Sequence, residues 1–247
     1  TFFKDITDIT TVYQKNWTRK LVGNHFYTTG QKNTAAYFQV PFDSYFEPNL
    51  PLYLLQDTLK VKLNGTNIDS DIAFLEAVIS AYPEIILRID FNGSLKISDA
   101  LNYSNKLSEF NIEYIEQPCK SIEEIKEFKV LTKIPVAIDE SLRLANDATN
   151  PEHIKTITDV ADFVVIKPIP VGGIKRFQSI AEQVIKSGKK VVVSGSMDTS
   201  IGLYETLLAQ SLLGESSQLV AGAGTGSILS ADVVAQTLRA HNGVIEI

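Results

Sequence analysis

The sequence is short of the features that mark secreted, membrane-bound and nucleic-acid-binding proteins. It has one cysteine, Cys119, so a single chain can form neither an internal disulfide nor a thiolate zinc site. No apolar run reaches the roughly 18 residues of a membrane span, and the first residues lack the basic start and apolar core of a signal peptide. The 23 basic and 29 acidic residues give a net charge of −6, with no long run of either sign. These absences predict a cytoplasmic protein that binds a small molecule and neither nucleic acid nor membranes.

The chain does have enough apolar residues for a large core. With 247 residues, 44% of them hydrophobic, it is about the size of one α/β barrel. Residues 1–49 carry scattered aromatics and no sustained helical period, and we interpret them as a reduced, partly β N-terminal cap with strands at 9–13 and 34–42. Residues 50–247 are expected to form an α/β barrel catalytic domain, because strand and helix patterns alternate along them.

Short apolar runs alternate with amphipathic segments throughout this second part. Such an order requires parallel strands joined by right-handed crossovers, and about eight of them close most simply into a barrel. The predicted fold class is therefore α/β, a TIM-type (β/α)7β-like barrel. The expected strands are 50–55, 58–63, 85–90, 112–116, 136–139, 163–167, 190–194 and 218–221. The expected helices are 69–81, 97–110, 121–131, 151–158, 174–187, 201–213 and 231–240.

One connection in this plan is irregular. Only Gln56 and Asp57 separate the first two expected strands, whereas a crossover between parallel strands needs a dozen or more residues. Either the barrel begins irregularly, or a segment is missing at this point.

Acidic residues end three successive expected strands. They are Asp90, Glu116 and Asp139. The carboxyl ends of parallel barrel strands meet at one rim, so the three side chains should converge there. Three unpaired anions would repel one another, and a hard divalent cation with oxygen ligands, Mg²⁺, is their natural companion. Each acid alone could instead cap the helix that follows it, but three on neighbouring strands favour a metal site.

Lysines end the strands on either side of these acids. Lys60 and Lys62 lie two apart on one strand and so share a face, and Lys167 follows the buried run 163–166. A lysine acts as a general base only when burial or a neighbouring positive charge lowers its pKa, and the first two lysines supply such a charge to each other. Lysines on two sides of a metal-bound carboxylate suit removal of the proton α to that carboxylate.

Taken in order, these motifs resemble the enolase superfamily, in its muconate-lactonizing-enzyme branch. A Lys or His base with Mg²⁺ is a known pattern of that superfamily. The resemblance covers about residues 58–240, and 116–120 and 139–143 are most similar to the o-succinylbenzoate synthases of the branch. The segments that carry it are Lys-x-Lys (60–62), Asp-x-Asn (90–92), Glu-Gln-Pro (116–118), Asp-Glu-Ser (139–141), Ile-Lys-Pro (166–168) and Ser-Gly-Ser (194–196).

The resemblance implies a Mg²⁺-dependent hydro-lyase of menaquinone biosynthesis. Asp90, Glu116 and Asp139 would bind the metal. Lys62 would remove the α-proton of 2-succinyl-6-hydroxy-2,4-cyclohexadiene-1-carboxylate, and Lys167 would stabilise the enediolate from the other face. Loss of water would then give o-succinylbenzoate.

The same resemblance implies positions for the substrate. Lys60 would lie beside its carboxylate. Ser194, Gly195 and Ser196 would lie beside its succinyl arm, where backbone N–H groups can bind an anion.

Two alternatives remain open. A dipeptide epimerase or N-acylamino acid racemase of the same branch would use the same two lysines, although the glycine-rich stretch 222–224 replaces the acidic motif that such enzymes usually carry there. A barrel without activity could instead serve as a binding or scaffold protein, because the family normally carries a longer cap before the barrel. The sequence does not indicate an oligomeric state.

Overall fold

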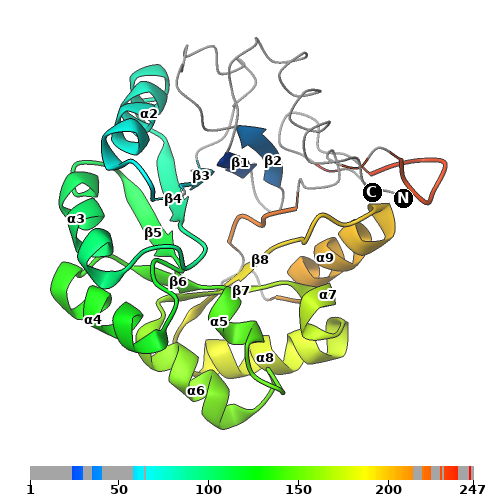
Figure 1. Ribbon diagram of the computed structural model, residues 1–247. Coiled ribbons are helices and arrows are strands. Elements are labelled where there is room, and N and C mark those ends of the chain that lie inside the picture. Colours follow the sequence, from blue (N-terminus) through cyan, green and yellow to red (C-terminus); the bar gives the residue numbers. More distant parts are fainter. Residues whose placement is uncertain are drawn as a thin grey trace.

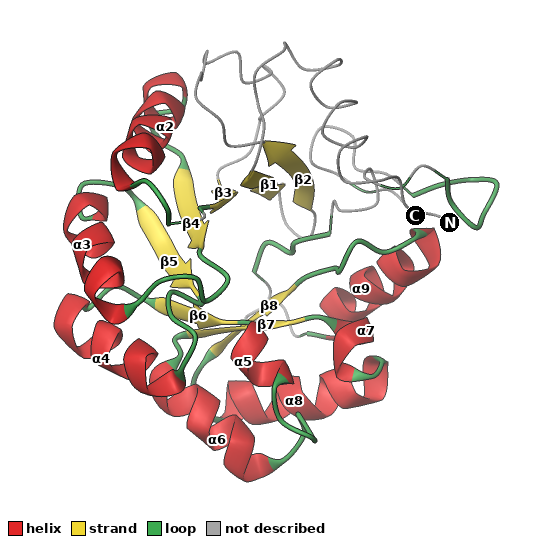
Figure 2. Ribbon diagram, in the orientation of Figure 1, coloured by secondary structure: helices red, strands yellow, loops and turns green. Residues whose placement is uncertain are grey.

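The chain forms an α/β fold in which helices lie along the outer side of a curved sheet (Figures 1 and 2). The computed structural model describes residues 24–29, 35–40, 58–63, 65–213, 219–223, 229, 231–238 and 245, the first two ranges by their backbone alone. The expected strands 9–13 and 50–55 and the joint at Gln56 and Asp57 lie outside these residues.

One sheet contains every strand of the described residues. The strands are β1 (Asn24–Thr29), β2 (Ala35–Val40), β3 (Thr58–Lys62), β4 (Ile86–Asp90), β5 (Ile112–Glu116), β6 (Val136–Ile138), β7 (Phe163–Ile166) and β8 (Lys190–Val193). Their order is β2-β1-β3-β4-β5-β6-β7-β8. The run from β3 to β8 is parallel throughout, whereas β1 is antiparallel to both of its neighbours. The parallel run therefore places all its carboxyl ends at one edge.

The six longer helices of the described residues follow the strands in the order that the sequence predicts, whereas the four-residue helices at 140–143 and 168–171 were not expected. The helices are α2 (Ile68–Ala81), α3 (Ile97–Leu107), α4 (Ile122–Thr132), α5 (Glu140–Arg143), α6 (Pro151–Val160), α7 (Pro168–Val171), α8 (Ile174–Lys186) and α9 (Ser200–Leu212). Capping residues in the sequence mark where two of these helices begin. Ser121 and Glu124 form a capping box on α4, and Asn150 caps α6 ahead of Pro151. Within the described part of the chain, none of the helices is both long and apolar enough to cross a membrane.

The side chains of the parallel strands alternate between two cores. Ile89, Ile115 and Val164 point outward and pack with the helices in the main hydrophobic cluster. Tyr114 and Phe163 point inward and join a second cluster with Ala137, Val165 and Val192. Because successive strand residues face opposite sides, one sheet can be covered by helices outside and still fill its own concave interior. That interior leads to the edge where the strands end.

The sheet in the described residues is a half-barrel. β1 pairs antiparallel along β3, at the edge where a closed parallel barrel would place its first strand. At the opposite edge, Ser194 makes an isolated parallel bridge to Gly222. The strand expected at 218–221 is wrong for the described residues 219–221, which contain no strand. The prediction of parallel strands alternating with helices is therefore confirmed for the part from β3 to β8.

The helix expected at 231–240 is wrong for the described residues 231–238, which contain no helical turn. Asp232 instead accepts hydrogen bonds from Ser200 N at 3.1 Å and Ser200 Oγ at 2.7 Å, at the first residue of α9. Leu238 N in turn donates to Ser200 Oγ at 2.8 Å. The segment thus runs across the N-terminus of α9 and supplies the cap that Thr199 does not make. These tertiary contacts override a helical apolar period.

A buried carboxylate between two outer helices gives a prediction about stability. Asp71 of α2 is fully buried and accepts a hydrogen bond at 2.6 Å from Tyr103 of α3, and burial raises its pKa to about 6. Between about pH 4 and pH 6 the folded chain holds a proton that the unfolded chain releases, so stability falls as the pH rises and the full cost is present above pH 6. The variant Asp71→Asn avoids this cost. Its stability relative to the wild type should increase by about 2 kcal/mol between pH 4.5 and pH 8. Urea unfolding at both pH values measures this, and a difference that does not change with pH would refute it.

Candidate functional site

Three acids gather at the carboxyl edge of the sheet. Asp90 ends β4, Glu116 ends β5, and Asp139 follows the last residue of β6. The strand register places Lys62 beside Asp90 and Asp90 beside Glu116. All three acids are almost completely buried, with at most 1% of each residue exposed. The structure therefore brings together the three acids that the sequence singles out.

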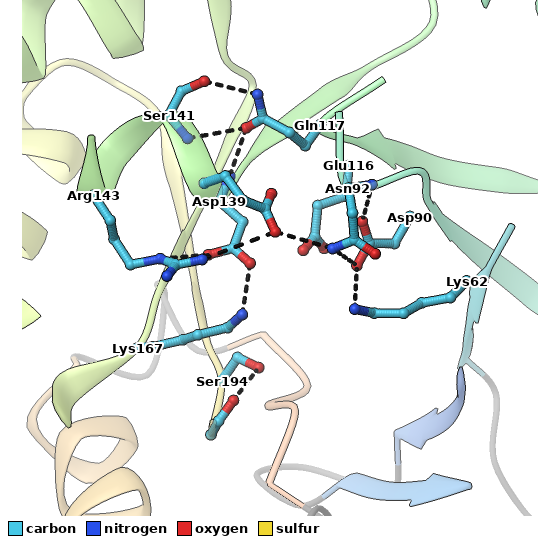
Figure 3. Close-up of polar contacts among 12 residues, drawn as sticks. Lys62, Asp90, Asn92, Glu116, Gln117, Asp139, Ser141, Arg143, Lys167 and Ser194 are labelled. Atoms are coloured by element: carbon cyan, nitrogen blue, oxygen red, sulfur yellow. Dashed lines mark hydrogen bonds and ion pairs between the residues drawn. The ribbon is translucent and has the colours of Figure 1, made fainter. Parts of the chain in front are cut away.

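Lysines contact these acids from two sides (Figure 3). On the β3 side, Lys60 Nζ donates to Glu116 Oε1 at 2.6 Å and lies 3.0 Å from Asp90 Oδ2, while Lys62 Nζ lies 3.7 Å from the same oxygen. On the β7 side, Lys167 Nζ donates to Asp139 Oδ2 at 2.6 Å. The ammonium groups therefore lie against the carboxylates themselves.

The two central acids differ in their pKa. Burial alone would raise the pKa of Asp90, but Lys60 and Lys62 hold it below its ordinary value. Burial, together with the charge of Asp90, raises the pKa of Glu116 to about 8, although Lys60 opposes the change. A buried site thus holds one acid that ionises readily and a neighbour that ionises only with difficulty.

The three acids supply the oxygen donors that a hard cation prefers, but their carboxylates are too far apart in this structure to bind one ion together. With the ammonium groups in place, no three carboxylate, imidazole or thiolate side chains in the described ranges are close enough together to hold one ion. Glu116 Oε2 is nevertheless buried and has no hydrogen-bond partner among the described residues. A buried carboxylate oxygen without a partner is costly, and three oxygen donors match what Mg²⁺ prefers. Cation binding would require the acids to close on the ion while the ammonium groups withdraw.

Two amide side chains beside the acids have contacts that sequence reasoning missed. Asn92 donates from Nδ2 to Asp90 Oδ2 at 3.4 Å and to Glu140 Oε1 at 2.9 Å. Gln117 directly follows Glu116 and contacts the backbone of Asp139. Both amides have a positive φ, 48° for Asn92 and 40° for Gln117. The signal available in the sequence is an amide placed one or two residues after a strand-ending acid.

Sequence reasoning also missed a guanidinium group beside Asp139. Arg143, the last residue of α5, donates from Nε to Asp139 Oδ1 at 3.3 Å. Its NH2 group lies 3.8 Å from Glu140. Asp139 thus has a cation at each of its oxygens, Arg143 at one and Lys167 at the other. The spacing of four residues between Asp139 and Arg143 is the sequence signal for this pair.

The expected substrate-binding segment lies at the end of β8, apart from the acids (Figure 3). Ser194 is buried and donates from Oγ to Gly195 O at 3.3 Å. Gly195 N donates to Gly222 O at 2.7 Å, and Ser196 N donates to Asp198 Oδ2 at 2.8 Å. The N–H groups of residues 195 and 196 therefore already have acceptors within the chain.

Fold and site together define a barrel-type α/β domain whose acids and lysines meet at the carboxyl edge of a parallel sheet. Residues 55–247 match the family model described as Enolase C-terminal domain-like, and the chain belongs to this family. Members of the enolase superfamily typically use a divalent metal ion. The resemblance predicted from the ordered motifs is thereby confirmed.

The chain is also similar in sequence to curated proteins. The chain is 35% identical over 193 residues to the o-succinylbenzoate synthase of Thermobifida fusca (strain YX), which covers 77% of this chain and 58% of the relative. The chain spans only slightly more than half the length of the curated relatives it matches.

Solved structures support the fold. A dipeptide epimerase from Enterococcus faecalis V583 has a TM-score of 0.69 at 23% identity and covers 90% of this chain and 63% of its own. MenC from Desulfotalea psychrophila LSv54 has a TM-score of 0.66 at 20% identity, over 78% of this chain and 53% of its own. At these identities the two structures show the fold alone.

Proposed function

We propose that this chain contains the catalytic barrel of an o-succinylbenzoate synthase, a carbon–oxygen lyase that dehydrates 2-succinyl-6-hydroxy-2,4-cyclohexadiene-1-carboxylate in menaquinone biosynthesis. The observation that carries the proposal is the meeting of three buried acids with lysines from both sides of the sheet. The curated relatives that match at 32–35% identity are o-succinylbenzoate synthases, which supports this substrate. The epimerase likeness supports the fold only.

Asp90, Glu116 and Asp139 would hold Mg²⁺ in this proposal. The ion would stabilise the negative charge that develops on the substrate carboxylate when the α-proton leaves. The orphaned Glu116 Oε2 and the all-oxygen donor set support this choice.

The lysines would carry the proton chemistry. Lys62, which is more exposed than Lys60 and lies farther from Asp90, would remove the α-proton. Lys167 would stabilise the enediolate from the opposite face, because it reaches the acids from the β7 side. Lys60, which pairs with Asp90 and Glu116 in the structure, would withdraw from them when the cation binds and would lie beside the substrate carboxylate.

The remaining parts of the assignment concern the succinyl arm and the domains. Residues 194–196 would lie beside the arm, and contact would use atoms other than their three backbone N–H groups, all of which donate within the chain. Residues 1–49 would form the reduced cap, and 50–247 would complete a TIM-type barrel.

The raised pKa of Glu116 gives a prediction about cation binding. A carboxyl with a pKa of about 8 is mostly protonated at pH 7 and must lose its proton before it can bind a metal. Binding of Mn²⁺ at pH 7 should therefore release close to one proton, and at pH 9 almost none. Titration calorimetry in two buffers of different ionisation enthalpy counts these protons. Heats that do not depend on the buffer at pH 7 would contradict the assignment of Glu116.

The activity itself is tested with the full chain. Purified protein supplied with Mg²⁺ should convert the cyclohexadiene substrate to o-succinylbenzoate, followed by chromatography, and EDTA should stop the reaction. If the chain binds the cation but converts no substrate, the barrel is a binding or scaffold domain. If the chain interconverts the stereoisomers of a dipeptide or an N-acylamino acid faster than it dehydrates the cyclohexadiene substrate, it is an epimerase or racemase and the proposal is wrong.

A further inference from the structure

Gln117 stands out because one buried side chain ties together the segments that carry the acids. Its amide makes four hydrogen bonds, all within the chain. Nε2 donates to Cys119 O at 3.1 Å and to Ser141 Oγ at 2.7 Å. Oε1 accepts from Asp139 N at 3.4 Å and from Ser141 N at 3.2 Å. Figure 3 shows the amide lying against Asp139 and Ser141, where α5 begins.

The backbone of Gln117 also contacts the loop that follows Asp90. Gln117 O accepts from Gly93 N at 2.7 Å, in the loop that follows Asp90. Gln117 N donates to Ala137 O at 2.9 Å on β6. Gln117, which directly follows Glu116 of β5, thus contacts both the loop after Asp90 of β4 and the start of α5 after Asp139.

The conformation of Gln117 supports a specific role. Its φ of 40° lies in the left-handed region, which residues with a side chain rarely adopt. Only 1% of the residue is exposed, and its amide is saturated by partners. Strained residues persist where the surroundings hold them in place, and they cluster at functional sites.

We propose that Gln117 is a positioning residue that sets the spacing of Asp90, Glu116 and Asp139 for a divalent cation. The inference rests on the proposed metal site and names Gln117 as a residue that raises the affinity of that site for the cation. Gln117 does not contact the cation or the substrate. It holds the backbone from which the carboxylates project, in the way that outer hydrogen bonds orient metal ligands.

The variant Gln117→Leu tests this role, because leucine keeps the size of the side chain but makes none of the four bonds. Mn²⁺ affinity measured by titration calorimetry should fall 10–100-fold, as is typical when an outer partner of a metal ligand is removed. Gln210→Leu is the matched control. Gln210 of α9 is also buried, at 2% exposed, and its Nε2 donates to Leu219 O at 3.0 Å, away from the acids. It should lower the melting temperature and leave Mn²⁺ affinity within twofold of the wild type.

The outcomes distinguish a residue that positions the acids from one that only stabilises the fold. If both glutamine variants melt earlier and bind Mn²⁺ as the wild type does, Gln117 only stabilises the fold and the inference is overturned. Ser141→Ala covers the case in which Gln117→Leu does not fold, since it removes one of the four bonds. It should weaken Mn²⁺ binding several-fold, and unchanged affinity overturns the inference. A wild-type chain that binds no Mn²⁺ overturns the metal site as well, which distinguishes that failure from a failure of Gln117 alone.

Discussion

Lys62→Ala and Lys167→Ala are each expected to lower the rate of dehydration by about 10³-fold or more. Lys62 would supply the base that removes the α-proton, and a positioned acid or base contributes about 10²–10⁴-fold. Lys167 would supply the positive charge on the other face, where it now pairs with Asp139. Steady-state measurement of kcat with saturating Mg²⁺ and substrate gives the two effects.

Lys129→Ala is the matched control for these variants. Lys129 of α4 is similarly half-buried and pairs with Asp162 at 2.7 Å, outside the site. Its removal should cost stability through a lost ion pair and leave kcat unchanged. If Lys62→Ala and Lys167→Ala keep the rate of the Lys129→Ala variant, Lys62 is not the base and Lys167 does not stabilise the enediolate.

Exchange of each acid for its amide should nearly abolish cation binding. Asp90→Asn, Glu116→Gln and Asp139→Asn preserve size but remove a negative charge from the proposed ligand set. We expect Mn²⁺ affinity to fall by more than the 10–100-fold that follows loss of an outer partner, because each acid would be a direct ligand. Calorimetric titration at pH 9 avoids competition from the Glu116 proton.

Asp162→Asn separates this effect from a general loss of charge. Asp162 accepts hydrogen bonds from Lys129 and from Val136 N, near the opposite end of β6 from Asp139. The variant removes the same charge and should bind Mn²⁺ like the wild type. Equal weakening by Asp162→Asn and by the three site variants would show that net charge, and not coordination, governs the binding.

The parallel part of the fold was predictable because its signals are local and repeated. The run 112–116 is a strand with the expected bounds, since a β-branched and aromatic segment ends in an acid before a proline. The antiparallel pairing of β1 with β3 was not predictable, because strand order depends on contacts distant in the sequence. The expected helix at 231–240 failed for a similar reason: Asp232 bonds to Ser200, a residue more than thirty positions away.

The acids and lysines of the site could be identified from the sequence because each ends a strand of one parallel sheet. Which lysine pairs with which acid could not be predicted from the sequence. The sequence predicts lysines on two flanks of a metal, whereas Lys60 lies directly between Asp90 and Glu116. The role proposed for Gln117 also depends on hydrogen bonds to Ser141, which is 24 residues away. Such contacts are set by side-chain geometry that spacing alone does not determine.

Anomalous scattering from crystals of the full chain grown with Mn²⁺ tests the central claim most directly. The account predicts one strong peak at the carboxyl edge of the sheet, with oxygens of Asp90, Glu116 and Asp139 at about 2.0–2.2 Å and the amino groups of Lys62 and Lys167 on opposite sides. A peak held by other residues, or no peak between these three acids at saturating Mn²⁺, would contradict it.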